Sequence, residues 1–316
     1  MVMLNRLLCV AALLFSQASL GGTAATLADP MERTLEHDGL TRTYLLYVPV
    51  DVEPDAPLII VMHGYMGSAQ LIMRYSAFNT LADQKGFIVV YPQGTIDQSG
   101  YRFFNVGYDT NVASKVNDID FIKALTLKLQ RQFHATPART FLAGNSNGGD
   151  MAYLMGCTNS ELYGAIASIT GVFMKHFQNL CIPTKPLPVF QLHGTEDVIS
   201  RYDGDMANKD GYGAYLSVPK TVSFWAKTNG LDEKAELLLE DIDKNDNTTV
   251  LFQRYFSTDN SDEVWSYTLR GGGHRWPMAN WSLEEEKEAL ELYGATNRDI
   301  SATDEIWRFF EHHLSN

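Results

Sequence analysis

Three residues of this sequence have the types and the order that acyl transfer requires. Ser146 lies at the centre of residues 144–149, which read G-N-S-N-G-G. Asp197 and His274 follow it along the chain, and three glycines stand directly before His274. A serine becomes a nucleophile when a histidine removes its proton and an acidic residue orients that histidine. The residue types therefore predict nucleophilic catalysis by Ser146, with His274 as the base and Asp197 as the acid.

The residues around Ser146 match a nucleophile elbow. An apolar run, residues 140–143, precedes the G-x-S-x-G pattern, and a helix-like run, residues 150–155, follows it. The elbow holds its serine in a sharp, strained turn, so the positions two before and two after must lack a Cβ atom. Gly144 and Gly148 stand at these positions. An ordinary glycine-rich turn is the alternative, and the flanking runs favour the elbow.

The other two catalytic candidates follow predicted strands in the chain order of α/β-hydrolases, serine, then acid, then histidine. Asp197 comes after an apolar run at 188–192, and His274 comes after another at 264–269. Glu196 is the near rival for the acid, and the other seven histidines are the rivals for the base. Of these, we expect His63 and His193, each before a glycine at a strand end, to hold their loops by ring hydrogen bonds.

An oxyanion hole needs two backbone N–H groups beside the nucleophile. The first is expected from Asn147, the residue after the serine, and the second from the loop after an early strand. Residues 63–65, H-G-Y, follow the apolar run 57–62. We therefore expect the Tyr65 amide to supply the second donor.

Apolar runs and helix-like segments alternate along the chain, which predicts a mostly parallel, doubly wound sheet with helices on both faces. No internal repeat or low-complexity linker interrupts the alternation. An acidic stretch at 241–247 lacks the glycine and glutamate of a calcium loop and is predicted to be a hairpin loop. Residues 200–219 are predicted to form an irregular loop. The expected strands cover 43–48, 57–62, 86–92, 140–143, 164–171, 188–192, 250–256 and 264–269, and the expected helices cover 78–85, 150–155, 222–227, 303–314 and a segment from 118.

Taken together, the motifs resemble the esterase family named for polyhydroxybutyrate depolymerases, whose secreted members include feruloyl and acetylxylan esterases. The resemblance covers the chain from about residue 42 to its end. It implies an α/β-hydrolase fold with Ser146, Asp197 and His274 as the catalytic triad. The motifs that carry it are H-G-Y at 63–65, Y-P-Q-G at 91–94, G-N-S-N-G-G at 144–149, H-G-T-E-D at 193–197 and G-G-G-H-R-W-P at 271–277.

The sequence departs from the family pattern at three places near the expected cleft: Asp150, Arg275 and the pair Phe104-Asn105. These departures bear on the substrate more than on the chemistry. Substrate-binding side chains are expected at Tyr65, Phe104 and Trp276, whose rings would form an aromatic cleft edge. Core packing is the alternative for each of them, and the favoured one for Phe104.

The predicted activity is that of a secreted serine carboxylic-ester hydrolase that forms an acyl-enzyme without a metal or an organic cofactor. Its expected substrates are soluble short-chain esters, hydroxyalkanoate oligomers or aryl and cinnamoyl esters. Three alternatives stay open: an acyltransferase on the same fold, a depolymerase of insoluble polyhydroxybutyrate, and a non-catalytic protein that kept the fold. The net charge of −13 argues against nucleic acid and anionic membranes as partners.

The beginning of the chain predicts export. Residues 1–25 combine a positive start, an apolar stretch and a small-residue exit, which is typical of a secretory signal peptide and too short for a membrane span. Residues 26–316 are then expected to form a single catalytic domain in a secreted or periplasmic protein. Cys157 and Cys181 remain beyond the signal, and a pair in an exported chain predicts a disulfide, two free thiols being the alternative.

Overall fold

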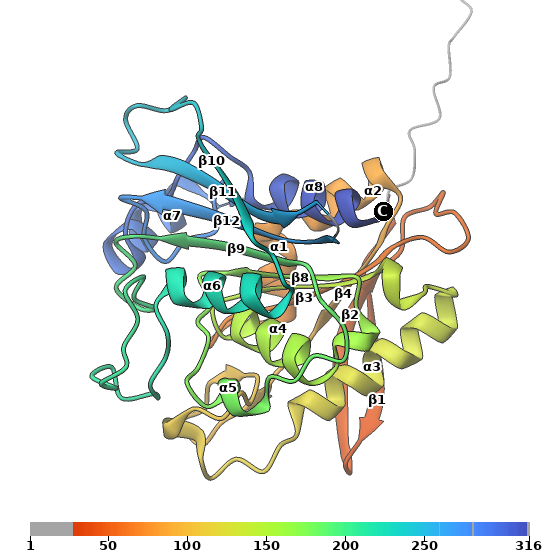
Figure 1. Cartoon of the computed structure of the whole chain (residues 1–316). Coiled ribbons are helices and arrows are strands. Elements are labelled where there is room, and N and C mark those ends of the chain that lie inside the picture. The colour runs from red at the N-terminus through yellow and green to blue at the C-terminus, as the bar shows by residue number, and fades with distance from the viewer. Residues whose placement is uncertain (1–27, 259, 280, 315–316) are drawn as a thin grey trace, which may run out of the picture.

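The computed structural model describes residues 28–258, 260–279 and 281–314. Its centre is a ten-stranded sheet (Figure 1). The strands lie side by side in the order β1 (Met31–His37), β2 (Leu40–Tyr47), β4 (Ile88–Pro92), β3 (Leu58–Met62), β7 (Thr140–Asn145), β8 (Ala165–Ile169), β9 (Val189–Gly194), β12 (Asn260–Arg270), β11 (Thr249–Ser257) and β10 (Glu233–Leu238).

The middle of the sheet is parallel and its two edges are antiparallel. The six strands from β4 to β12 pair in parallel, with β2 and β1 added antiparallel on one side and β11 and β10 on the other. Every residue of β3, β4 and β8 is buried, as continuous apolar runs predict for strands covered on both faces. The predicted α/β class and mostly parallel sheet are confirmed. The carboxyl ends of the parallel strands form one edge, where ligands of open α/β sheets bind.

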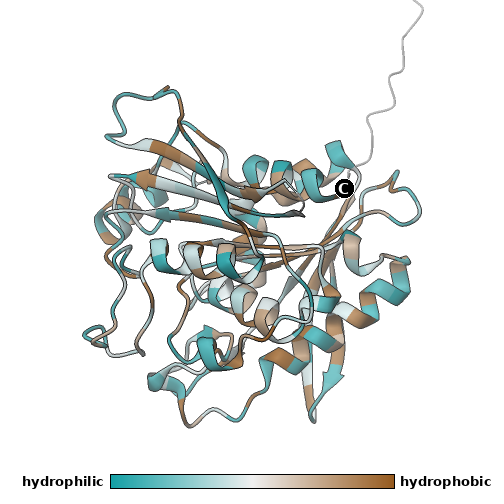
Figure 2. Ribbon diagram, in the orientation of Figure 1, coloured by the Kyte–Doolittle hydropathy of each residue, from teal (hydrophilic) through white to brown (hydrophobic). Residues whose placement is uncertain are grey.

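Helices bury an apolar core on each face of this sheet. One core packs β-strand side chains against α3 (Asp118–Phe133), α4 (Asn147–Thr158) and α6 (Val218–Thr228). The opposite core packs them against α1 (Ala69–Ser76), α2 (Phe78–Lys85) and α8 (Ala302–Leu314). Hydrophobic colouring accordingly concentrates on the central strands, whereas the helices carry hydrophilic and hydrophobic residues in turn (Figure 2).

Seven α-helices and strands of the described part of the chain were not among the predicted ones: β1, α1, β5 (Thr95–Ile96), β6 (Arg102–Phe103), α5 (Phe177–Leu180), β10 and α7 (Leu283–Tyr293). The helix expected from residue 222 begins at Val218, because the Ser217 side chain accepts the Lys220 N–H and a proline occupies the first turn. The acidic stretch 241–247 connects the antiparallel strands β10 and β11, as predicted for a hairpin loop. Residues 200–217 are irregular, and two isolated bridges to Tyr215 order them.

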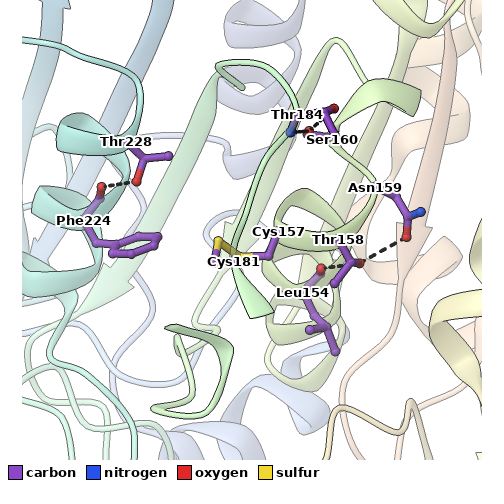
Figure 3. Close-up of a disulfide and its surroundings, with 9 residues drawn as sticks. All are labelled: Leu154, Cys157, Thr158, Asn159, Ser160, Cys181, Thr184, Phe224 and Thr228. Carbon is purple, nitrogen blue, oxygen red and sulfur yellow. Dashed lines mark hydrogen bonds between the residues drawn. A yellow bond between two sulfur atoms is a disulfide. The ribbon is translucent and has the colours of Figure 1, made fainter. Parts of the chain in front are cut away.

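The predicted disulfide is present between Cys157, at the end of α4, and Cys181, which directly follows α5 (Phe177–Leu180) (Figure 3). It joins the elbow helix to the segment that leads into β9. The predicted signal peptide lies outside the described residues. Across the part of the chain that the structure describes, no helix has both the length and the apolar character needed to cross a membrane.

Candidate active site

Ser146 occupies a strained turn between β7 and α4. Its φ of 53° lies in the left-handed region, which costs a non-glycine residue free energy, and its ψ is −122°. A Cβ atom on Gly144 would lie 2.1 Å from the Gly148 carbonyl oxygen, and one on Gly148 would lie 2.2 Å from that of Met62. These contacts are too short for any other residue type. The backbone around Ser146 therefore has the geometry that the elbow pattern predicts.

Asp197 and His274 come together across the edge of the sheet. Asp197 lies in the loop after β9 and His274 in the loop after β12, which are neighbouring parallel strands. The His274 Nδ1 atom lies 2.7 Å from Asp197 Oδ2. This contact orients the ring and leaves its Nε2 atom to face elsewhere, as the base of a triad requires.

Asp197 is almost fully buried and carries four close contacts. Its Oδ1 accepts the backbone N–H groups of Ile199 and Ser200 at 2.9 and 2.7 Å. Its Oδ2 faces His274 Nδ1 and, at 3.1 Å, the Nε2 atom of His193. Burial by itself would raise the pKa of Asp197. The charge of His274 and hydrogen bonds from both histidines outweigh that effect and hold the pKa well below its usual value of 3.8. Asp197 is thus an anion across the physiological range.

Ser146 and His274 line one pocket of about 550 Å³. Its walls are mainly apolar and aromatic. The floor comes from the loop after β3 and from α1, and the opposite wall comes from α7 and the segment before it. The aromatic residues of the lining are Tyr65, Tyr75, Trp276, Trp281 and Tyr293.

The expected oxyanion loop reaches the nucleophile. A Cβ atom on Gly64 would lie 3.2 Å from Ser146 Cβ and 3.8 Å from Ser146 Oγ, so the Gly64 backbone rests against the serine. Tyr65 follows it and lines the pocket. On the other side, the Asn147 side chain bonds both to the backbone N–H of Phe104 at 2.7 Å and to its carbonyl oxygen at 2.9 Å. These bonds fix the first residue of α4 beside Ser146.

The expected aromatic cleft edge is present in part. Tyr65 is partly exposed, and its hydroxyl donates to Asp97 Oδ2 at 2.5 Å. Trp276 also lines the pocket, but only 3% of it is exposed, because its ring packs edge-on against Tyr75 and Phe78. It therefore belongs mainly to the core.

The prediction that Phe104 borders the cleft is wrong. The residue is completely buried, and its ring packs 4.8 Å from that of His63. Phe104 directly follows the two-stranded hairpin of β5 and β6, and its backbone N–H and carbonyl groups hold the Asn147 side chain. Core packing, the favoured alternative for this residue, is what the structure shows.

The departures from the family pattern have structural roles. Asp150, buried within α4, accepts the Tyr108 hydroxyl at 2.5 Å and the Val172 N–H at 2.6 Å, and burial raises the pKa of its carboxyl to about 7. Arg275 is buried beside His274 and donates to Glu286 of α7 at 2.5 Å. Burial lowers the pKa of its guanidinium, although Glu286 opposes that effect. Neither residue was predicted to make these contacts.

Sequence reasoning missed the wall that α7 and Trp281 contribute. The helix has no buried residue, so it lacks the apolar periodicity by which helices are found. It does carry a capping box, in which Ser282 and Glu285 bond each other's backbone N–H groups. The S-x-x-E spacing at 282–285 was the signal that could have located its start.

Among the described residues, one group of side chains could hold a metal ion. The ligand atoms of His37, Asp38 and Asp120 lie within 4.8 Å of one another, and both aspartates are exposed. None of the three lines the pocket around Ser146. Potential ligands for a catalytic metal are therefore not gathered at the described part of this pocket.

Comparison with known proteins relates this chain to esterases. Residues 42–182 match the model of the family described as Esterase PHB depolymerase. The chain is related to the PHB depolymerase-like esterases. This relationship confirms the resemblance expected from the motifs, and it supports an esterase.

The relatives include the putative esterase NocK of Nocardia uniformis subsp. tsuyamanensis, 26% identical over 84% of this chain and 78% of that protein. Feruloyl esterase B of Piromyces equi is 25% identical over 69% of this chain. The chain spans only 39% of feruloyl esterase B, and 22% of the bifunctional acetylxylan esterase/xylanase XynS20E of Neocallimastix patriciarum.

Among solved structures, an acetyl xylan esterase from Aspergillus awamori superposes with a TM-score of 0.54 and 16% identity. The superposition covers 83% of this chain and 98% of that one. At this identity the likeness concerns the fold alone. The chain has the α/β-hydrolase fold.

Proposed function

We propose that this chain is an exported serine carboxylic-ester hydrolase with Ser146, Asp197 and His274 as its catalytic triad. The 2.7 Å contact between His274 Nδ1 and Asp197 Oδ2, beside a strained serine in the same pocket, carries the proposal. The esterase relatives and the family match support the reaction class.

In the proposed reaction, Ser146 Oγ attacks the ester carbonyl while His274 Nε2 takes the serine proton. Asp197 keeps the Nδ1 proton in place and stabilises the imidazolium that forms. The backbone N–H groups of Tyr65 and Asn147 bind the oxyanion of the tetrahedral intermediate. His274 then gives its proton to the leaving alcohol. Water, activated by the same histidine, releases the acid from the acyl-serine.

The pocket favours soluble esters with a flat or apolar group. Its volume of about 550 Å³ fits a small molecule, and its aromatic walls can stack on a ring. We therefore expect short-chain, hydroxyalkanoate-oligomer and aryl or cinnamoyl esters to be hydrolysed. The names of the relatives, feruloyl and acetylxylan esterases, agree with small acyl groups.

Export is proposed on two observations. The predicted signal peptide opens the sequence, and the domain contains a disulfide, a bond that persists in oxidising compartments. The mature protein would then act in the periplasm or outside the cell.

A fluorophosphonate probe and a p-nitrophenyl acetate assay test the proposal together. The wild-type protein should react at Ser146, and Ser146→Ala and His274→Ala should each reduce kcat by about 10⁴-fold or more while the fold is retained. Ser261→Ala, which alters an exposed serine of β12, is the matched control and should behave as the wild type. Activity within tenfold of wild type in Ser146→Ala or His274→Ala would overturn the triad. Preferential transfer of the acyl group to an added alcohol would identify an acyltransferase instead.

A further inference from the structure

The buried side of Asp197 faces a second histidine. His193 is the fifth residue of β9, directly before Gly194, and its side chain is completely inaccessible to solvent. Its Nε2 atom lies 2.6 Å from the Ser200 carbonyl oxygen and 3.1 Å from Asp197 Oδ2. The same Oδ2 atom receives His274 Nδ1. One carboxylate oxygen is therefore shared by two imidazole rings.

The surrounding groups determine where the His193 proton lies. Both neighbours of Nε2 are oxygen acceptors, so Nε2 must carry a hydrogen and donate it. The Nδ1 atom lies 3.1 Å from the Gln191 side-chain nitrogen, which donates to it. The Gln191 oxygen in turn accepts the Tyr153 hydroxyl. His193 thus donates from Nε2 and accepts the Gln191 amide hydrogen at Nδ1.

These contacts form a buried chain of donors that begins in the elbow helix. Tyr153 of α4 bonds Gln191, Gln191 bonds His193, and His193 bonds Asp197. Hydrogen bonds of this kind polarise one another where water is excluded. The last donor reduces the negative charge that Asp197 presents to His274.

We propose that His193 is a positioning residue that lowers the basicity of the His274 ring by donating a hydrogen bond to Asp197. The proposal rests on the triad of the proposed function. A less basic His274 loses its resting proton at lower pH, so it is available to accept the proton of Ser146 over a wider range. His193 itself does not line the pocket.

Other polar groups around the pair come from several elements. The charged or titratable ones are Asp150 of α4, Arg275 next to His274, Glu196 next to Asp197, and Tyr293 of α7, whose ring lies 6.3 Å from that of His274. Tyr202 of the irregular segment lies 6.2 Å from the His193 ring. These groups are the same in His193→Leu and in His193→Gln, so a difference in shift between the two variants reports the hydrogen bond from residue 193 to Asp197.

Two substitutions separate the hydrogen bond from the space that the ring fills. His193→Leu removes the donor, whereas His193→Gln keeps an amide N–H that can reach the position of Nε2. His313→Leu is the matched control, because His313 is also buried but lies in α8 and lines no part of the pocket. The readouts are the pH dependence of kcat/KM on p-nitrophenyl acetate and the ¹⁵N NMR titration of the His274 ring in labelled protein.

We expect His193→Leu to move the acid limb of the rate profile and the His274 titration upward by about one pH unit. At pH values on the acid side of this limb, kcat/KM of His193→Leu should be about tenfold lower than that of the wild type. His193→Gln, which keeps a donor, should show little of this shift, and His313→Leu should show none. Unchanged titration in a folded His193→Leu variant, or an equal shift in His193→Gln, would overturn the proposal.

The experiment still decides the proposal if His193→Leu does not fold or if the wild-type protein is inactive. If His193→Leu does not fold, Gln191→Met replaces it, because loss of the amide donor weakens His193 as a donor. A smaller upward shift is then expected, and no shift would count against the proposal. If the wild-type protein lacks esterase activity, the proposed function fails, while the NMR titration still decides whether His193 acts on His274 through Asp197.

Discussion

At the scale of single residues, the site is arranged before a substrate arrives. Ser146 is strained, Asp197 is held by four contacts, and His274 is oriented by Asp197. Such preorganisation avoids rearrangement during the reaction and is a main source of catalytic power. The elbow was predictable because only glycine fits two of its positions. The ring hydrogen bond from His193 to its own loop was also predicted, but its contact with Asp197 was not, since a histidine before a glycine has no distinctive spacing.

Two pocket tryptophans should respond differently to truncation. Trp276→Ala removes a buried ring that packs on Tyr75 and Phe78 and bonds Thr303, so it should destabilise the fold by about 3–5 kcal/mol. Trp281→Ala removes a half-buried ring and should raise KM for aryl esters more than it lowers kcat, with a small loss of stability. Urea unfolding and steady-state kinetics on both variants measure these effects. A larger stability loss in Trp281→Ala would contradict this assignment.

At the scale of elements, helices and strands were predictable where they bury a regular apolar pattern. The all-buried strands β3, β4 and β8 appear where their apolar runs predicted them. The strand β10 is exposed along its whole length, and α7 buries no residue. Pairing with β11 holds β10, and ion pairs such as Arg74–Glu285 hold α7, and an apolar pattern reports neither. Hence the loops that carry Ser146, Asp197 and His274 were predictable, and one wall of the pocket was not.

The position of α7 should depend on its ion pairs. Arg74 of α1 donates two hydrogen bonds to Glu285, at 3.0 and 2.6 Å. Arg74→Ala should therefore speed amide hydrogen exchange within residues 283–293 and raise KM, while the Tm stays close to that of wild type, because exposed ion pairs contribute little to global stability. Lys85→Ala, which removes another exposed pair, with Glu311, is the control. Equal exchange of α7 in the wild type and in Arg74→Ala would show that the pair does not hold the helix.

The helix α8 should make the fold sensitive to acid. Burial lowers the pKa of His313 from 6.5 to about 3, so the unfolded chain binds this proton more readily than the folded one. The resulting loss of stability begins as the pH falls below about 6.5, the unfolded value, and grows until the pH nears 3. His313→Leu should shrink the difference in unfolding free energy between pH 7 and pH 5, as measured with urea. An unchanged difference would mean that His313 does not contribute. Burial also lowers the pKa of His63, to about 4, so part of the loss of stability in acid should remain in both proteins.

At the scale of the whole molecule, the disulfide ties the elbow helix to the chain that enters β9. Cys157 and Cys181 are separated by 24 positions in the sequence, and the bond closes a loop that contains β8. A loop of this length is worth about 3 kcal/mol by chain entropy. Reduction, or the substitution pair Cys157→Ser and Cys181→Ser, should lower the Tm by several degrees. Thermal unfolding with and without a reductant measures this, and equal Tm values would show that the bond is dispensable.

The two tryptophans of the pocket also make the site optically visible. The chain has five tryptophans, and Trp276 and Trp281 line the pocket beside Ser146. An aromatic ester that enters the Ser146→Ala variant will change the surroundings of both indoles without being turned over. The intrinsic fluorescence of the protein should then report occupancy directly, so that affinities can be ranked across candidate esters before any product is detected.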